Sequence, residues 1–501
     1  MKTIKLYIIP AVFIFTLSYS CEGFLEIFPE TSLSSDTFFK TESDFEQAVN
    51  AAYAPLRSIA NDRSWILSEL RSDNVYFGRN PNFGAREQEQ DIADFALPVT
   101  DGITSNTNVR DQYRSDYQII SRANQILATI DDVEFDSKNK DNLKGQTYFL
   151  RAYAYFELVR YFSSVPLHLE PVTERSQAAQ PLASEEALYD LIIEDALKAI
   201  DMLPLKSDQE LGRATKGAAQ MLLANVYMER KNWAEAEALL RKIVDSGEYG
   251  LMDDFEDVIS TSTGNKNNRE SIFEIQFKEG PDGLNGSFMY NIAPKPILAS
   301  ELQTLTGTSN PQPLDGEARY VPTPDIIEAF EEGDLRKDLS IGYIEMQDVP
   351  WEEGYYPYAK KFFKPHALHG NHGVNWPIYR YSEVLLFLAE ALNEQGKNDE
   401  AVQYLDMVRE RAGLSEATGD LKEAIFHERQ VEFAFENKRW FDLVRTGRAE
   451  KVMTDFGEKL WADPYLYYYP KGREPRPHAF KNGILLHYPL PADESSLSPH
   501  F

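Results

Sequence analysis

The chain has 501 residues with 51 lysines and arginines against 80 aspartates and glutamates, which gives a net charge of −29. This charge repels nucleic-acid phosphates and no basic run offsets it, so nucleic-acid binding is excluded as a function. The single cysteine excludes an internal disulfide, and the length suffices for one large core or for two or three ordinary ones.

Residues 1–20 predict a secretory signal peptide. Lys2 and Lys5 precede an apolar run of 12 residues, which is interrupted by Pro10 and is shorter than the roughly 20 residues that span a membrane. Small and polar residues and then Cys21 follow, an order that resembles the lipobox of bacterial lipoproteins. The resemblance implies that Cys21 is the first mature residue and carries the lipid that anchors the protein to a membrane. A free thiol is the alternative.

Residues 21–250 are expected to form an N-terminal helical part. Apolar residues recur every three to four positions in the ranges 43–62, 112–133, 143–162 and 184–203, which is the period of helices with one buried face. Ser43 and Ser184 precede acidic residues, so they are the expected N-caps of the first and the last of these helices.

An internal repeat makes the helical prediction more specific. Six positions follow tetratricopeptide spacing, and the six positions 165 residues later keep the same residue classes. They are Leu223, Ala224, Tyr227, Ala236, Leu240 and Ile243 in the first copy, and Leu388, Ala389, Leu392, Ala401, Leu405 and Val408 in the second. The alanines permit the close approach of two antiparallel helices. Because the copies are not adjacent, the sequence predicts a tetratricopeptide-like scaffold interrupted by a long insertion.

Residues 251–375 are predicted to be that insertion, a loop-rich lobe laid on the helices. Helical periodicity fades there, glycine, proline and asparagine become frequent, and only the range 270–277 alternates like a strand. Helical patterns resume in residues 376–501, which we expect to complete the same single domain. The predicted fold class is therefore all-α, with a tetratricopeptide-like scaffold that carries the lobe.

Three segments, at 376–414, 425–447 and 487–501, resemble the SusD/RagB family of surface lipoproteins. The ranges 24–32, 45–57 and 67–78 share this resemblance, so it runs in order from the lipobox to the last residue. The final motif departs from the family pattern: Leu490 replaces an isoleucine between two prolines, and Ser498 replaces an asparagine before Pro499.

The resemblance implies a protein that binds and does not catalyse. Such proteins are lipid-anchored to the outer membrane, face the cell exterior, need no cofactor, and pass a glycan to a partner, a SusC-like TonB-dependent transporter. A peptide is the ligand of some members and stays an alternative. The acidic clusters at 253–257 and 331–334 leave a glycoside hydrolase as a weaker rival, because acid-rich runs are more often solvated surface. No metal site is predicted from the three histidines between positions 366 and 372.

A sugar site needs flat aromatic faces for the pyranose rings and planar polar groups for the hydroxyls. Two stretches supply both kinds of residue. The first contains Trp65, Asp73, Asn74, Tyr76, Phe77, Arg79 and Asn80, and the second contains Trp351, Tyr355, Tyr356 and Tyr358. Tyr290 with Asn291 forms a weaker third group. The alternative is that these aromatic residues cap the helical core.

Other prominent residues are assigned to the scaffold. The charged residues of the segment 425–447 fall at helical spacings, so we expect them to pair with one another or with neighbouring helices. They are Glu428, Arg429, Glu432, Arg439, Asp442 and Arg445. Trp376 and Trp440 are expected to contribute to packing.

Overall fold

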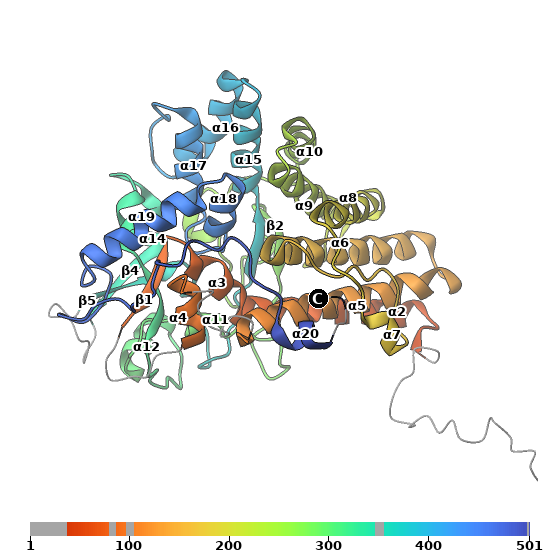
Figure 1. The fold of residues 1–501 in the computed structure, drawn as a ribbon. Helices are drawn as coiled ribbons and strands as arrows, with labels where there is room; N and C mark the ends of the chain where they lie inside the picture. The colour runs from red at the N-terminus through yellow and green to blue at the C-terminus, as the bar shows by residue number, and fades with distance from the viewer. Residues whose placement is uncertain (1–37, 80–86, 97–104, 346–354, 498–499, 501) are drawn as a thin grey trace, which may run out of the picture.

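The computed structural model describes residues 38–79, 87–96, 105–345, 355–497 and 500, and its larger part is a scaffold of antiparallel helices (Figure 1). Each helix of this series packs against the next one, so the apolar face of each is buried by its neighbours. In chain order they are α2 (Glu42–Asp62), α5 (Thr107–Thr129), α6 (Ser137–Phe162), α8 (Glu185–Met202), α9 (Lys216–Glu229), α10 (Trp233–Asp245), α15 (Tyr381–Glu394), α16 (Asn398–Arg411) and α17 (Leu421–Glu432).

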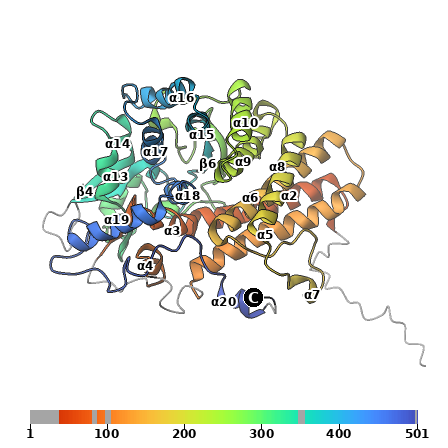
Figure 2. The ribbon, with the colours of Figure 1, turned by 45° about the horizontal axis from the view of Figure 1, so that its top comes forward.

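The two copies of the predicted repeat are stacked helical hairpins. The first copy is α9 with α10, the second is α15 with α16, and α10 packs against α15, as Figure 2 shows. Ala224, Ala236, Ala389 and Ala401 are all completely buried, as the close approach of these helices requires. The repeat is therefore confirmed. The two hairpins are neighbours in space although residues 246–380 separate them in sequence.

One of the two predicted N-caps is correct. Ser184 caps α8, because its side chain accepts a hydrogen bond from the backbone N–H of Ala187 at 3.2 Å. Ser43 does not cap α2. Thr41 takes that position, and its backbone N–H donates to the side chain of Asp44 at 2.8 Å in a capping box. The acidic residue three positions after the cap was the signal for this assignment.

Small antiparallel sheets of two strands each lie in the lobe and at its borders, and two of them pair a lobe strand with a strand from outside the lobe. They pair β1 (Val75–Gly78) with β3 (Ala318–Pro322), β2 (Ser271–Ile275) with β6 (Trp376–Arg380), and β4 (Ile341–Glu345) with β5 (Tyr355–Ala359). β2 confirms the strand expected within 270–277, but the other five strands were not predicted. Strands such as β1 and β3 are buried at every position, so they lack the alternation that reveals a strand in sequence.

Further helices, most of them short, complete the described structure. They are α3 (Ser64–Leu67), α4 (Glu87–Ala93), α7 (Arg175–Ala178), α11 (Phe288–Asn291), α12 (Ala299–Thr306), α13 (Pro324–Ala329), α14 (Leu335–Ser340), α18 (Arg439–Arg445), α19 (Ala449–Ala462) and α20 (Ala492–Leu497). Single 3-10 turns lie at η1 (Glu69–Arg71), η2 (Ile130–Asp132), η3 (Lys206–Asp208), η4 (Phe255–Asp257) and η5 (Lys360–Phe362). Helices dominate and the sheets are small, so the all-α fold class is confirmed.

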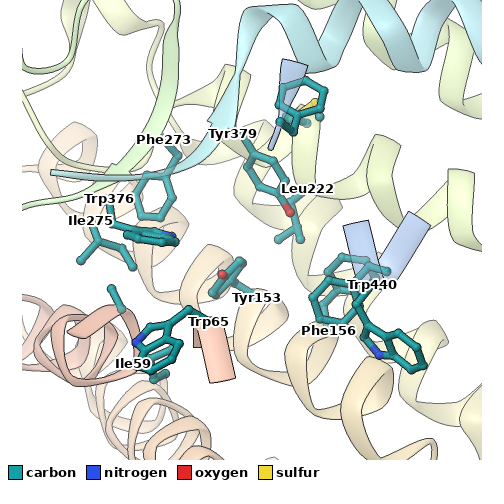
Figure 3. Close-up of a cluster of buried hydrophobic side chains, with 14 of the residues drawn as sticks. Ile59, Trp65, Tyr153, Phe156, Leu222, Phe273, Ile275, Trp376, Tyr379 and Trp440 are labelled. Atoms are coloured by element: carbon teal, nitrogen blue, oxygen red, sulfur yellow. The ribbon is translucent and has the colours of Figure 1, made fainter. Parts of the chain in front are cut away.

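The core joins scaffold and lobe through large aromatic side chains. Figure 3 shows Trp65 from α3, Phe273 from β2, Trp376 from β6 and Trp440 from α18 in one buried cluster. Trp376 stacks on Phe362 with ring centroids 4.8 Å apart. The packing roles predicted for Trp376 and Trp440 are confirmed, since both are at most 2% exposed.

A buried network of charges lies where α17 meets the lobe. The carboxylate of Glu432 accepts hydrogen bonds from Arg411 at 2.6 Å, from Arg380 at 2.9 Å and from Arg336 at 3.0 Å. All four residues come from different elements, so the network ties α17 to α14, α16 and the end of β6. The scaffold role predicted for the charged residues of segment 425–447 is confirmed by this network and by the further pairs Glu428–Arg336, Arg429–Asp442 and Arg445–Glu390.

Candidate functional site

The first predicted stretch forms α3, η1 and β1 and lies inside the protein. Trp65, Tyr76 and Phe77 are at most 1% exposed, so their rings have no open face on which a sugar can stack. Asp73 accepts two hydrogen bonds from Arg439, at 2.7 and 2.8 Å. This buried ion pair joins the segment just before β1 to α18. These residues therefore hold the N-terminal part against the C-terminal part, and the ligand contacts predicted for them are corrected accordingly.

Asn74 and Arg79 of the same stretch are also engaged within the protein. The side chain of Asn74 donates to Glu69 at 2.8 Å, and burial raises the pKa of Glu69 to about 7. Arg79 pairs with Asp94 at 3.2 Å, and its guanidinium carbon lies 4.8 Å from the centre of the Phe77 ring. The aromatic and planar polar residues of this stretch do lie together, but they form a buried contact between segments of the chain.

The third predicted group lies beside Trp65. Tyr290 is buried, and its hydroxyl is hydrogen-bonded to His366 at 2.6 Å. Asn291 is partly exposed and donates to Asp62 at 3.1 Å. Arg319 contacts Asn291 at 3.5 Å and lies 5.3 Å from the Trp65 ring, so the structure brings these two predicted residues together around one arginine.

The second predicted stretch lies on β5 and before it. Tyr356 is completely buried, and any side chain at Gly78 would collide with its hydroxyl. The two main predicted stretches therefore do meet, since β1 and β5 pack together here, but they meet through a core contact. Tyr358 is also buried. The backbone of Tyr355 pairs with β4, while Trp351 and Asn80 lie outside the described residues.

Two exposed tyrosines and an exposed leucine lie on two segments next to this stretch, and we call their place the lobe edge, defined by Tyr343, Tyr465 and Leu466. Their exposed fractions are 56%, 41% and 51%. Tyr343 lies on β4, and the other two lie in the segment after α19. Both parts approach Tyr468: Ile344 of β4 and Tyr468 pack against the same small cluster around Tyr356, and Tyr468 N–H donates to the Tyr465 carbonyl at 3.1 Å.

The segment that carries Tyr465 is fixed on both sides by hydrogen bonds. Tyr467 donates to Asp325 at 2.7 Å, and the Tyr468 hydroxyl donates to the carbonyl of Pro322 at 2.7 Å. The carbonyl of Tyr468 in turn accepts from the backbone N–H of Arg79 at 3.1 Å. The lobe edge thus presents tyrosine rings on a firm support, as recognition of a rigid ring requires.

The sequence prediction missed the lobe edge. The signal was the run from Tyr465 to Tyr469, four tyrosines in five residues between two prolines. It falls within residues 376–501, which are expected to complete the domain, and no site is predicted there. Tyr343 stands alone in an ordinary strand sequence, and only the fold places it near this run.

Two further observations concern the described part of the chain. No three histidine, cysteine, aspartate or glutamate residues within it are grouped so that they could hold a metal ion. No helix within it has the length and the apolar composition needed to cross a membrane.

Comparison with known proteins identifies the family. The sequence profile of the SusD family matches residues 341–500, and a second profile, described as starch-binding and associating with the outer membrane, matches residues 23–228. A SusD-like protein of Formosa agariphila is 26% identical over 497 residues, which cover 91% of this chain and 92% of that protein.

Solved structures agree with this result. A laminarin-binding SusD-like protein superposes with a TM-score of 0.71 at 25% identity, over 92% of this chain and 98% of that one. Surface glycan-binding protein A from Bacteroides thetaiotaomicron, in complex with laminarihexaose, superposes with a TM-score of 0.72 at 20% identity. The superposition covers 91% of this chain and 98% of that one. This second likeness concerns the fold alone. With matching profiles at both ends of the chain and relatives along its length, the protein belongs to the SusD-like family.

Proposed function

We propose that the protein binds a glycan at the lobe edge and delivers it to a SusC-like TonB-dependent transporter. The observation that carries this proposal is the exposure of Tyr343 and Tyr465 on a firm support at one edge of the lobe. An exposed tyrosine offers an apolar face to a pyranose ring and a hydroxyl to its polar edge. Neither ring is needed to fill the core, so a binding role explains their exposure better than packing does.

The similar proteins support the ligand class. One neighbour binds laminarin, and another was solved with laminarihexaose. The matching profile refers to association with the outer membrane, which supports the location. We infer that Cys21 carries the lipid anchor, that the lobe faces the cell exterior, and that the protein releases its ligand chemically unchanged.

Replacing Tyr343 and Tyr465 together by alanine is expected to weaken glycan binding by roughly tenfold or more, which corresponds to about 1.4 kcal/mol. The melting temperature should stay close to that of the wild type, because exposed rings contribute little to the fold. Purified protein would first be screened against polysaccharides and peptide mixtures, and the variant would then be titrated by calorimetry with the glycan that binds.

Tyr227→Ala is the matched control, since this tyrosine is partly exposed on the scaffold helix α9. It should bind the glycan like the wild type. Equal affinity of the Tyr343→Ala, Tyr465→Ala double variant and the wild type would refute the lobe edge as the site. Binding of peptides alone would refute the ligand class, and release of short sugars by pure protein would show catalysis.

The lipid anchor is tested separately through Cys21. Wild-type protein in cells should incorporate labelled palmitate and partition into detergent, because acyl chains contribute about 0.8 kcal/mol per buried CH₂. The Cys21→Ser variant should be unlabelled and water-soluble. Its glycan affinity should not change, since the lobe is remote in sequence from the anchor. If both proteins partition alike, Cys21 does not carry the anchor.

A further inference from the structure

A polar pocket lies in the scaffold, between the C-terminal ends of α6 and α9, the first turns of α8, and α18. Its volume is about 320 Å³. This falls at the lower end of the roughly 300–1,000 Å³ that small-molecule sites occupy. The pocket shares no lining residue with the lobe edge. Its walls combine valine and phenylalanine side chains with arginine, lysine, glutamate, tyrosine and histidine.

Three polar side chains of this pocket make no hydrogen bond or ion pair with any described residue: Glu229, Tyr189 and the exposed Lys231. Glu229 lines it from the end of α9, and its carboxylate makes no hydrogen bond or ion pair with any described residue. The hydroxyl of Tyr189 on α8 likewise has none. Many buried carboxylates of the described residues, such as those of Asp73 and Glu432, are paired with arginine, whereas the partly buried Glu229 is not. An unpaired acceptor in a pocket wall indicates a group that receives a ligand's donor.

Two nitrogen-bearing side chains of the pocket, Arg160 and His487, are held in place by other groups. The guanidinium carbon of Arg160 lies 3.9 Å from the ring centre of Phe441 and 4.1 Å from that of Phe156, and the group pairs with Glu157. His487 is fixed by a hydrogen bond between Nδ1 and the backbone carbonyl of Arg160 at 3.2 Å. Arg160 therefore offers N–H donors at a fixed position, beside the free acceptors of Glu229.

We propose that this pocket binds one hydroxyl-rich sugar unit, as a second saccharide site on the scaffold. A sugar hydroxyl donates one hydrogen bond and accepts others, so vicinal hydroxyls can satisfy a carboxylate and a guanidinium at once. A ligand carrying a full charge fits less well, because both signs of charge line the same pocket. The choice of a saccharide as ligand class rests on the proposed function, whereas the pocket itself does not.

The ionisation of Glu229 provides a specific readout. Burial raises the pKa of Glu229 to about 7, and the positive charge of Arg160 opposes this rise. Above pH 7 the carboxylate accepts hydrogen bonds from hydroxyls at both oxygens, so sugar binding should strengthen as the pH rises through 7. The charged or titratable groups around it are Arg160 on α6, Tyr189 on α8, Glu390 on α15, and Asp442 and Arg445 on α18. Arg230 and Lys231 after α9, Glu185 and His487 line the same pocket.

The test uses the Tyr343→Ala, Tyr465→Ala double variant as background, so that the lobe edge no longer contributes. Glucose, galactose, mannose and xylose serve as probes, and saturation-transfer NMR reports binding between pH 6 and pH 8. At least one sugar should bind, more tightly at pH 8. Adding Glu229→Gln should weaken that binding by about tenfold and abolish its pH dependence. Glu235→Gln, an exposed position on α10, is the matched control and should change neither.

Two results would overturn the inference. One is that none of the four sugars binds the background protein. The other is that Glu229→Gln, with a wild-type melting temperature, binds them with the same affinity and the same pH dependence. The proposed function fails by a different result, namely unchanged polysaccharide binding in the lobe-edge variant, so the two proposals can fail independently.

Discussion

Replacing Glu432 by alanine is expected to lower the free energy of unfolding by about 3–5 kcal/mol. Glu432 is completely buried and receives hydrogen bonds from Arg411, Arg380 and Arg336. Its removal leaves buried positive charge that the remaining carboxylates compensate only in part. Urea denaturation followed by circular dichroism measures the loss.

The control for this variant is Glu423→Ala in the first turn of the same helix. Glu423 is exposed and pairs with Arg448 at 2.6 Å on the surface, where an ion pair contributes about 0–1 kcal/mol. Both variants replace a glutamate of α17 by alanine, and they differ in the burial of that glutamate. Similar losses for both would show that the buried network contributes no more than a surface pair does.

The contribution of Glu432 should also depend on pH. Burial alone would raise the pKa of this carboxyl, but the charges of Arg411, Arg380 and Arg336 together hold it well below its usual range. Because the folded-state pKa lies below the unfolded one, Glu432 stabilises the protein above the unfolded value of about 4.3. This stabilisation is lost as the pH falls toward the folded-state pKa. The stability difference between wild type and Glu432→Gln should therefore shrink in acid.

Tyr76→Ala and Tyr356→Ala are each expected to cost about 3–5 kcal/mol of stability, the range for large aromatic residues cut from a core. Tyr76 is 1% exposed, approaches the Tyr469 hydroxyl at 3.1 Å, and packs against Phe456 with ring centroids 5.8 Å apart. Tyr356 is completely buried. Thermal melts of the two variants measure the effect.

Phenylalanine variants separate packing from hydrogen bonding. Tyr76→Phe keeps the ring and loses the hydroxyl contact with Asp94, so it should cost about 1 kcal/mol. A Tyr76→Ala protein with wild-type stability and weakened glycan binding would contradict the buried role, and would restore the first stretch as a ligand site.

The helices were predictable because a helix that buries one face repeats its apolar residues every three to four positions, whatever its partner. The repeat alanines such as Ala236 and Ala401 also allowed the pairing of these helices to be predicted, since small residues at fixed spacing indicate a close contact between helices. The strands were harder to predict from the sequence. β1 and β3 are buried throughout, and their pairing depends on residues that are far apart in sequence.

The candidate site was predictable only as a composition. Aromatic residues next to amides, acids and arginines describe a sugar site, but they describe a buried joint equally well. Asp73 meets Arg439 across 366 positions of sequence, and no local pattern reports such a partner. The lobe edge could not be predicted for another reason. Tyr343 and Tyr465 belong to segments far apart in the sequence, and only the fold brings both segments to Tyr468.

The contacts made by the last part of the chain have a consequence for the timing of folding. The hydroxyl of Tyr488 donates to the carbonyl of Leu67 at 3.1 Å, across 421 positions, and Arg71 donates to the carbonyl of Leu485. Ribosomes add about 5–20 residues per second, so roughly 20–80 s pass between the synthesis of the two partners. Throughout that interval the growing chain cannot close around Leu67, so these two contacts form only after nearly the whole chain has been made.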